Sequence, residues 1–137
     1  MPITVVLVDD QALVRGALAA LLDLETDLSV IGEASTGAEA VAVVRSRAPD
    51  VVLMDVDMPG MDGIEATAAL RAAGSAARVL IVTTFGRPGY LRRALQAGAS
   101  GFVVKDTPAR LLADAVRRVH AGMRVVDPAL ATDSLLA

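Results

Sequence analysis

The chain has 137 residues, a length that fits one domain with a single hydrophobic core. Its net charge of -3 argues against a nucleic-acid-binding surface, and the absence of cysteine excludes disulfides, thiolate metal sites and cysteine nucleophiles. Hydrophobic residues make up 54% of the chain but aromatic residues only 2%, so Ala, Val and Leu must fill the core.

No apolar run reaches the length of a membrane span. The N-terminus does not resemble a secretory signal, because the apolar run Ile3–Val8 is short and leads directly into Asp9 and Asp10. We therefore expect a cytoplasmic protein without a membrane partner.

Short apolar runs alternate along the chain with segments of helical periodicity. In chain order, the predicted elements are strand Ile3–Val8, helix Gln11–Asp23, strand Leu28–Ala34, helix Ala38–Arg47, strand Val51–Met54, helix Gly63–Ala73, strand Val79–Val82, helix Pro88–Ala97, strand Gly101–Val104 and a helix from Thr107-Pro108 to Ala121. All strands but the second are almost continuously apolar, which is typical of strands buried on both faces of a parallel sheet.

Strands that alternate with helices predict an α/β doubly wound fold, here a five-stranded parallel sheet flanked by five helices. We expect this domain to span residues 1–122. Residues 123–137 are expected to be a C-terminal extension, or the start of a linker to an output domain that is not present.

The first helix carries two apolar stripes about 100° apart, which follows from the helical period. Val14, Leu18 and Leu21 are expected to face the core. The second stripe consists of Leu13, Ala17, Ala20 and Leu24.

The fifth helix is expected to turn Leu112, Val116 and Val119 inward and to leave Leu111 and Ala115 beside them. The first and fifth helices are neighbours in a fold of this order, so their spare apolar edges predict a homodimer interface. A face formed by the fourth and fifth helices is the competing interface, and a monomer is the other alternative.

Polar residues follow four of the predicted strands, at the edge where doubly wound sheets place their sites. They are Asp9, Asp10, Asp55, Thr83 and Lys105. Three carboxylates at one edge repel one another unless a cation shares the site, and a hard divalent ion such as Mg2+ suits oxygen ligands. With a Lys and a Thr hydroxyl beside them, these groups suit attack of a carboxylate on phosphorus.

Several stretches resemble the receiver domains of two-component response regulators, over about residues 3–122. They are Val8-Asp9-Asp10, Met54-Asp55 with the following residues to Gly63, Val82-Thr83-Thr84, and Gly101-Phe102 with the following residues to Lys105. Gly98–Phe102 and Lys105-Asp106 are similar to the NarL/LuxR-type branch, whose members carry a C-terminal helix-turn-helix. The stretch Thr83–Tyr90 further resembles regulators of lipid desaturation.

The resemblance implies the flavodoxin-like receiver fold and a role for each residue of the site. Asp55 is implied to accept a phosphoryl group from a sensor histidine kinase, and the chain to catalyse only its own phosphorylation and dephosphorylation. The implied Mg2+ ligands are Asp9, Asp10, Asp55 and the backbone carbonyl of Asp57.

For the switch, the resemblance implies that Lys105 and Thr83 contact the phosphoryl group. Phe102, which stands where a Tyr is common in the family, is implied to change rotamer as Thr83 moves. Phosphorylation is implied to control dimerisation, and DNA to be bound only through a helix-turn-helix domain absent from this chain.

Two functions from other classes are the alternatives to this interpretation. Asp55-Val56-Asp57 also matches the Asp-x-Asp of haloacid-dehalogenase-like phosphohydrolases, but there the other acids come later in the chain and a cap domain is common. A dinucleotide-binding module is disfavoured because Asp9-Asp10, rather than a Gly-rich turn, follows the first strand. A degenerate receiver that is never phosphorylated is disfavoured because the acids, Thr83 and Lys105 are all present.

Overall fold

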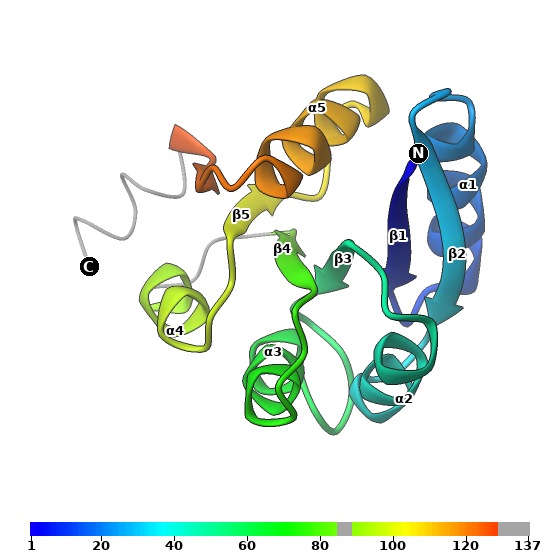
Figure 1. The fold of residues 1–137 in the computed structure, drawn as a ribbon. Helices are drawn as coiled ribbons and strands as arrows, with labels where there is room; N and C mark the ends of the chain where they lie inside the picture. The colour runs from blue at the N-terminus through cyan, green and yellow to red at the C-terminus, as the bar shows by residue number, and fades with distance from the viewer. Residues whose placement is uncertain (85–88, 129–137) are drawn as a thin grey trace.

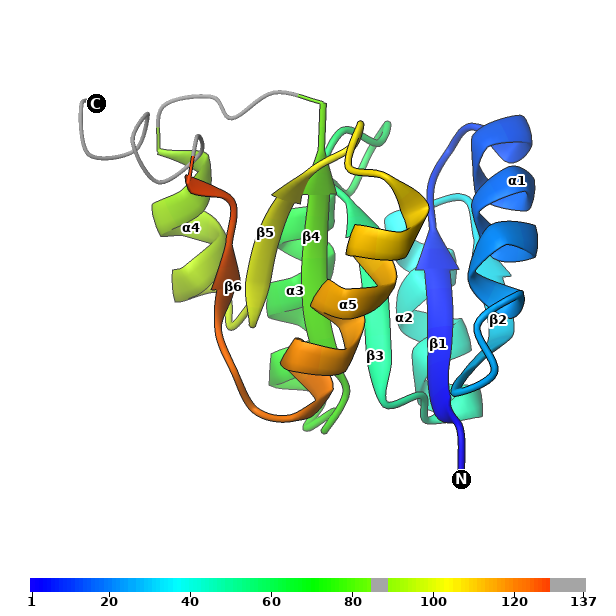
Figure 2. The ribbon, with the colours of Figure 1, turned by 90° about the horizontal axis from the view of Figure 1, so that it is seen from above.

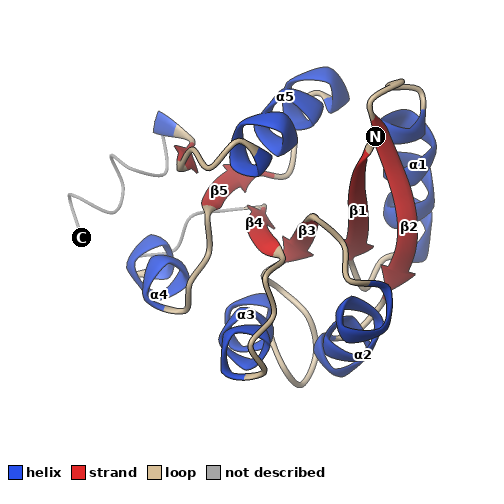
Figure 3. Ribbon diagram, in the orientation of Figure 1, coloured by secondary structure: helices blue, strands red, loops and turns tan. Residues whose placement is uncertain are grey.

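The computed structural model describes residues 1–84 and 89–128. In this part of the chain, six parallel strands and five helices are joined by loops (Figures 1 and 3). The strands are β1 Ile3–Val8, β2 Leu28–Ala34, β3 Val51–Asp55, β4 Arg78–Thr83, β5 Gly101–Val104 and β6 Val125–Val126. The helices are α1 Ala12–Asp23, α2 Gly37–Arg47, α3 Gly63–Ala72, α4 Tyr90–Gln96 and α5 Ala109–His120. The strand order in the sheet is β2-β1-β3-β4-β5-β6.

The sheet is the middle layer of three (Figures 1 and 2). Helices α1 and α5 lie side by side over one face, and α2, α3 and α4 cover the other. Each face carries its own apolar cluster, one around Leu22, Leu80 and Val116 and the other around Ile81 and Phe102. The central strands are therefore buried on both sides, which explains their continuous apolar sequence.

The predicted doubly wound fold is confirmed, and the predicted elements agree with the structure to within one or two residues at each end. The predicted start of the fourth helix at Pro88 lies outside the described residues. Thr107, a suitable N-cap residue at the predicted start of the fifth helix, does not cap it. The N-cap residue is Pro108, without a side-chain bond, because the Thr107 hydroxyl donates to the carbonyl of Val104 at 2.7 Å instead.

The predicted core face of α1 is wrong for two of its three residues, since only Leu18 is half-buried and packs against the core. Ala19 and Leu22 are its buried residues, whereas Val14 and Leu21 are 39% and 49% exposed. Helix α1 packs against α5 as well as against the sheet, and this turns Val14 and Leu21 toward the space between the two helices. Ala19 and Leu22 lie outside both predicted stripes, because apolar residues occupy most of the circumference of α1 and the periodicity could not tell which face meets the sheet.

The expected apolar edges of α1 and α5 are exposed with one exception. Leu13, Leu24 and Leu111 are 89%, 76% and 51% exposed, and Ala17 and Ala20 are exposed too. Ala115, expected on the exposed edge, is buried. Ala115 belongs to the apolar cluster between the sheet and helices α1 and α5, and the unpredicted strand β6 lies across a hollow from it.

Among the described residues, no helix is both long enough and apolar enough to cross a membrane.

Candidate phosphoryl and metal site

Three predicted acidic residues meet at the carboxyl ends of β1 and β3. These strands are neighbours in register, with Val8 opposite Met54, so Asp9 and Asp55 follow paired positions. The strand order reverses here, because β2 and β3 lie on opposite sides of β1, and a doubly wound sheet opens a crevice at such a point. Carboxylate oxygens of Asp9, Asp10 and Asp55 all lie within 4.8 Å of one another, as predicted.

The chain after Asp55 turns back, so that Gly63 lies against the backbone of Asp55. The amide of Gly63 donates to the carbonyl of Val56 at 3.0 Å, which brings the start of α3 against the end of β3. A Cβ atom on Gly63 would lie 2.0 Å from the carbonyl oxygen of Asp55, so only glycine fits at this position. Helix α3 then begins with a capping box between Asp62 and Glu65.

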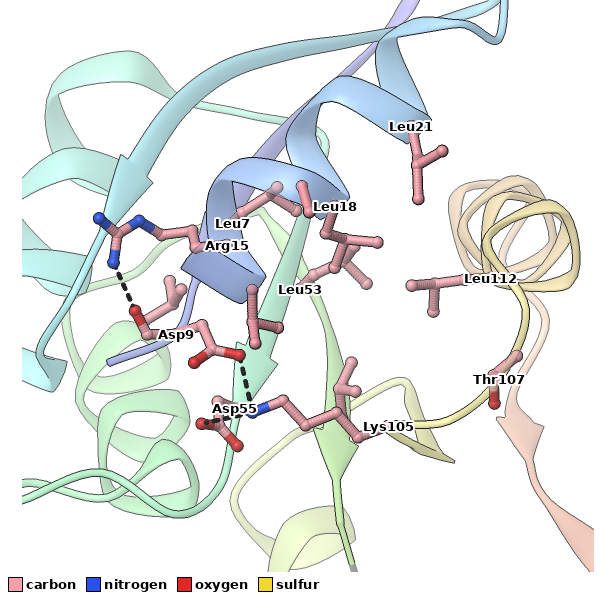
Figure 4. Close-up of a pocket in the computed structure, with 14 residues that line it drawn as sticks. Leu7, Asp9, Arg15, Leu18, Leu21, Leu53, Asp55, Lys105, Thr107 and Leu112 are labelled. Carbon is pink, nitrogen blue, oxygen red and sulfur yellow. Dashed lines mark hydrogen bonds and ion pairs between the residues drawn. The ribbon is translucent and has the colours of Figure 1, made fainter. Parts of the chain in front are cut away.

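Lys105 joins the two buried carboxylates (Figure 4). Its Nζ lies 2.8 Å from Oδ2 of Asp9 and 3.4 Å from Oδ2 of Asp55. The other oxygen of Asp9 accepts the amide of Gln11 at 2.8 Å. Asp9 and Asp55 are buried, whereas Asp10 is exposed, so the cluster has one side open to water.

The buried position of Asp55 changes its proton affinity. Burial raises the pKa of Asp55 from 3.8 to about 6, and the charge of Asp9 adds to this, although Lys105 pulls in the opposite direction. Burial by itself would lower the pKa of Lys105, but its bonds and charge interactions with Asp9 and Asp55 raise it. Lys105 is therefore a permanent cation here, and a further cation would favour the ionised form of Asp55.

The remaining predicted site residues lie around this cluster. Thr83 is buried at the end of β4, opposite Val104 of the neighbouring strand β5. The side chain of Asp57 is exposed, and its amide donates to Oδ1 of Asp55 at 3.4 Å, which holds the main chain of the loop beside the carboxylate. Phe102 is fully buried in the cluster between the sheet and α2–α4.

Two features of this region were not predicted. Arg15 donates from its guanidinium to the carbonyl of Asp9 at 2.7 Å and to Glu33 at 3.0 Å. An apolar cavity of about 290 Å³ runs between α1 and α5 and ends at Asp55 and Lys105, as Figure 4 shows. A charged residue among the apolar residues of α1 was the available signal for Arg15, and nothing in the sequence indicated the cavity.

We predict that Asp55→Asn stabilises the chain against unfolding at pH 7 without divalent ions. The pKa of Asp55 is about 6 in the folded chain and lies near its ordinary value of 3.8 in the unfolded chain. Because the folded chain binds this proton more tightly than the unfolded chain does, protonation of Asp55 stabilises the fold. This stabilisation is complete below pH 3.8 and is lost as the pH rises through 6. We therefore expect Asn to raise the free energy of unfolding by about 1–3 kcal/mol at pH 7.

The measurement is urea unfolding at pH 7 and pH 4, where the gain should shrink. The exposed variant Asp57→Asn is the control and should differ from wild type by no more than about 0.5 kcal/mol. Equal stabilities of Asp55→Asn and wild type at pH 7 would contradict the raised pKa of Asp55.

Known proteins are similar to this chain in sequence and in fold. Residues 5–117 match the family described as the response regulator receiver domain. The chain is 44% identical over 131 residues to the transcriptional regulatory protein DesR of Bacillus subtilis, a match that covers 96% of this chain and 65% of DesR. It is 38% identical over 128 residues to the response regulator protein VraR of Staphylococcus aureus, covering 93% of this chain and 61% of VraR.

Solved structures agree with these sequence matches. A LuxR-family two-component response regulator from Aurantimonas sp. superposes with a TM-score of 0.92 at 34% identity, over 99% of this chain and 97% of that one. The receiver domain of a NarL regulator from Mycobacterium tuberculosis superposes with a TM-score of 0.85 at 37% identity, over 88% of this chain and 98% of that one. The chain spans less than two thirds of the length of DesR and of VraR.

Proposed function

Because the chain belongs to the response regulator receiver domain family, in its NarL/LuxR-type branch, we propose that Asp55 accepts a phosphoryl group from a sensor histidine kinase. The observation that supports this role is the position of Asp55. It is buried at the end of β3, 3.4 Å from the Lys105 ammonium and within reach of two further acids. Receiver domains are signalling domains, and the family match leaves no support for the haloacid-dehalogenase alternative.

In the proposed transfer, a carboxylate oxygen of Asp55 forms a bond to phosphorus while the bond from phosphorus to the histidine nitrogen of the donor breaks. The imidazole leaves and takes a proton from water. The ammonium of Lys105 already contacts the attacking carboxylate. After transfer it can contact a phosphoryl oxygen instead and stabilise the negative charge there. Thr83 ends the adjacent strand β4 one residue after Val82, which pairs with Asp55, and we assign its hydroxyl to a phosphoryl oxygen.

Mg2+ fits the donor set at this edge of the sheet. The three clustered side chains offer only oxygen ligands, and Asp10 is open to water, which suits an ion that keeps part of its hydration shell. We assign its ligands to Asp9, Asp10, Asp55 and the backbone carbonyl of Asp57. When bound, Mg2+ would neutralise negative charge on the acids and on the transferred phosphoryl group.

The direct test is the intact mass of the chain after incubation with acetyl phosphate and Mg2+. One added phosphoryl group is expected, and none when EDTA is present. The chain would return to its original mass on standing, because we also propose that it catalyses its own dephosphorylation. A chain that gains no mass from acetyl phosphate or from a phosphorylated sensor kinase would refute the proposal.

We propose that phosphorylation controls a homodimer formed through α1 and α5. The surface that supports it consists of the exposed apolar residues Leu13, Ala17, Ala20, Leu24 and Leu111. A monomer gains nothing from leucines 50–90% exposed on adjacent helices, and a two-fold pairing would bury them. Ala115 is omitted from this interface because it is buried.

We predict that Leu13→Asp weakens this dimer. Leu13 is 89% exposed, so the change leaves the monomer intact but places a charge in the proposed contact. The Kd of the beryllofluoride-activated dimer should rise by about tenfold or more, since burial of a Leu contributes about 1.5–3 kcal/mol. Analytical ultracentrifugation measures the Kd, and Met123→Asp, also exposed but beyond the end of α5, is the control. Unaltered dimerisation of Leu13→Asp would contradict the α1–α5 interface and favour the face formed by α4 and α5.

We further propose that the receiver domain comprises the expected residues 1–122 together with β6, which pairs with β5 and carries the domain past residue 122, and that the chain beyond leads into an output domain that binds DNA. DesR is named as a transcriptional regulatory protein and is longer than this chain, which supports such an output. The cytoplasmic location of the protein is part of the same proposal, because a sensor kinase and DNA would both be met there. The resemblance of Thr83–Tyr90 to regulators of lipid desaturation stays a prediction, and residues 85–88 lie outside the described part of the chain.

A further inference from the structure

Strand β6 is seated on the open edge of β5 by main-chain hydrogen bonds. The amide of Val125 donates to the carbonyl of Ser100 at 3.2 Å, and the amide of Asp127 donates to the carbonyl of Phe102 at 3.0 Å. The register places Val125 opposite Gly101 and Val126 opposite Phe102. The last element of the described chain is therefore bonded directly to the backbone of Phe102.

The β5 edge is shaped to receive this strand. A Cβ on Gly101 would lie 2.8 Å from the carbonyl oxygen of Val125, so the absence of a side chain at Gly101 lets the two backbones approach. Val125 is half-buried and packs against the apolar cluster beneath α1 and α5. In the projection of Figure 2, β6 runs alongside β5 at the end of the sheet near α4.

Strand β6 nevertheless has few contacts with the rest of the domain. The strand has two residues, and a hollow of about 450 Å³ lies between it and α5, lined by Leu111, Ala115 and Arg118 among others. Few side-chain contacts therefore add to its main-chain bonds. Within the described residues it is the shortest strand of the sheet, and we expect it to be the first to separate.

The other side of β5 is tied to the phosphoryl site. The amide of Lys105, the residue after β5, donates to the carbonyl of Thr83 at 2.6 Å. If Asp55 carried a phosphoryl group, contacts from Lys105 and Thr83 to it would draw the ends of β4 and β5 toward β3. Such a movement would take β5 away from β6, because β6 pairs with the edge of β5 that faces away from β4.

We propose that the segment Val125–Asp127 is a releasable docking strand, paired with the β5 edge in the unphosphorylated domain and loosened when Asp55 is phosphorylated. This inference rests on the proposed function of Asp55. It gives the chain a route by which chemistry at the site reaches the residues that follow position 127. Release and phosphorylation are linked reciprocally, so a domain whose strand cannot dock should bind a phosphoryl mimic more tightly.

The first test is amide hydrogen exchange of the 137-residue chain with and without beryllofluoride and Mg2+. Protection of the Val125 and Asp127 amides should fall by about tenfold with the mimic bound, in the usual range of such couplings. The amide of Ile3, which donates to Asp27 at 2.8 Å near the opposite edge of the sheet, is the internal reference and should keep its protection.

The second test compares two proline variants. Val125→Pro removes the amide that donates to Ser100, whereas Val126→Pro removes an amide that points away from β5 in the alternation of an edge strand. Beryllofluoride should bind Val125→Pro about tenfold more tightly than wild type, and Val126→Pro like wild type. Protection of the Ile3 amide shows whether each variant is folded, and the exchange experiment on wild type stands without either.

The outcomes distinguish a failure of the docking strand from a failure of the proposed role of Asp55. Binding of beryllofluoride with unchanged protection at Val125 and Asp127 overturns the docking strand and leaves the phosphoacceptor in place. Failure of wild type to bind beryllofluoride overturns the phosphoacceptor, and the proposed release with it. Equal affinities of Val125→Pro and wild type overturn the reciprocal link.

Discussion

Asp55→Asn is expected to abolish phosphorylation by acetyl phosphate and by a phosphorylated sensor kinase. Asp55 is the acid at the end of β3 whose carboxylate contacts Lys105, and an amide in its place is a poor nucleophile for phosphorus. Asn also keeps the size of the side chain, so the site and the fold should persist. The measurement is intact mass or Phos-tag mobility after incubation with Mg2+ and the donor.

The matched control for this variant is Asp57→Asn, two residues further along the same loop. Its side chain is exposed and its backbone carbonyl is unaffected by the change, so phosphorylation should proceed. If Asp55→Asn gained a phosphoryl group with the yield of wild type, another residue would be the acceptor. Peptide mapping of the phosphorylated chain would then identify that residue.

Asp10→Ala is expected to lose Mg2+ affinity and phosphorylation together. Asp10 is the exposed member of the acidic group, so its removal leaves the buried pair of Asp9 and Lys105 intact. Loss of one negatively charged ligand should weaken Mg2+ binding by about tenfold or more. Isothermal titration calorimetry measures the affinity, and the rate of phosphorylation at saturating acetyl phosphate measures the chemical consequence.

Asp106→Ala supplies the control, because Asp106 is also exposed and follows Lys105 at the same end of the sheet, but lies outside the acidic group. It removes the same charge without removing a proposed ligand. Similar losses of Mg2+ affinity in Asp106→Ala and Asp10→Ala would mean that general charge, and not ligation by Asp10, holds the ion. Undiminished binding in Asp10→Ala would remove it from the ligand set.

The fold and the meeting of the acids could be predicted because both follow from local patterns. A strand buried on both faces must be apolar throughout, and a residue that ends a parallel strand must lie at the carboxyl edge of the sheet. Asp9, Asp10 and Asp55 therefore had to come together once the strands were recognised. Membership of the receiver family could likewise be inferred from short motifs in a fixed order.

Other features depended on how the layers pack. Helix α1 is apolar around most of its circumference, so its pattern did not single out one buried face. The contact with α5 decided that Ala19 and Leu22, outside both predicted stripes, meet the sheet while Val14 and Leu21 line a cavity. The strand Val125–Val126 could not be predicted from the sequence, because two valines form a strand only where the edge of another strand is free to pair with them. Ala115 is likewise buried because α5 turns it into the apolar cluster that it shares with the sheet and α1.

The charge pattern of the site was decided at the same level. Sequence order placed Lys105 at a strand end, but only the folded chain shows its ammonium nearer to Asp9 than to Asp55, at 2.8 Å against 3.4 Å. The raised pKa of Asp55 likewise follows from burial by segments remote in the sequence. Local pattern determines which strands and helices form, because periodicity and turn residues act over short distances. Which faces meet, and which charges pair, is settled by packing between distant segments.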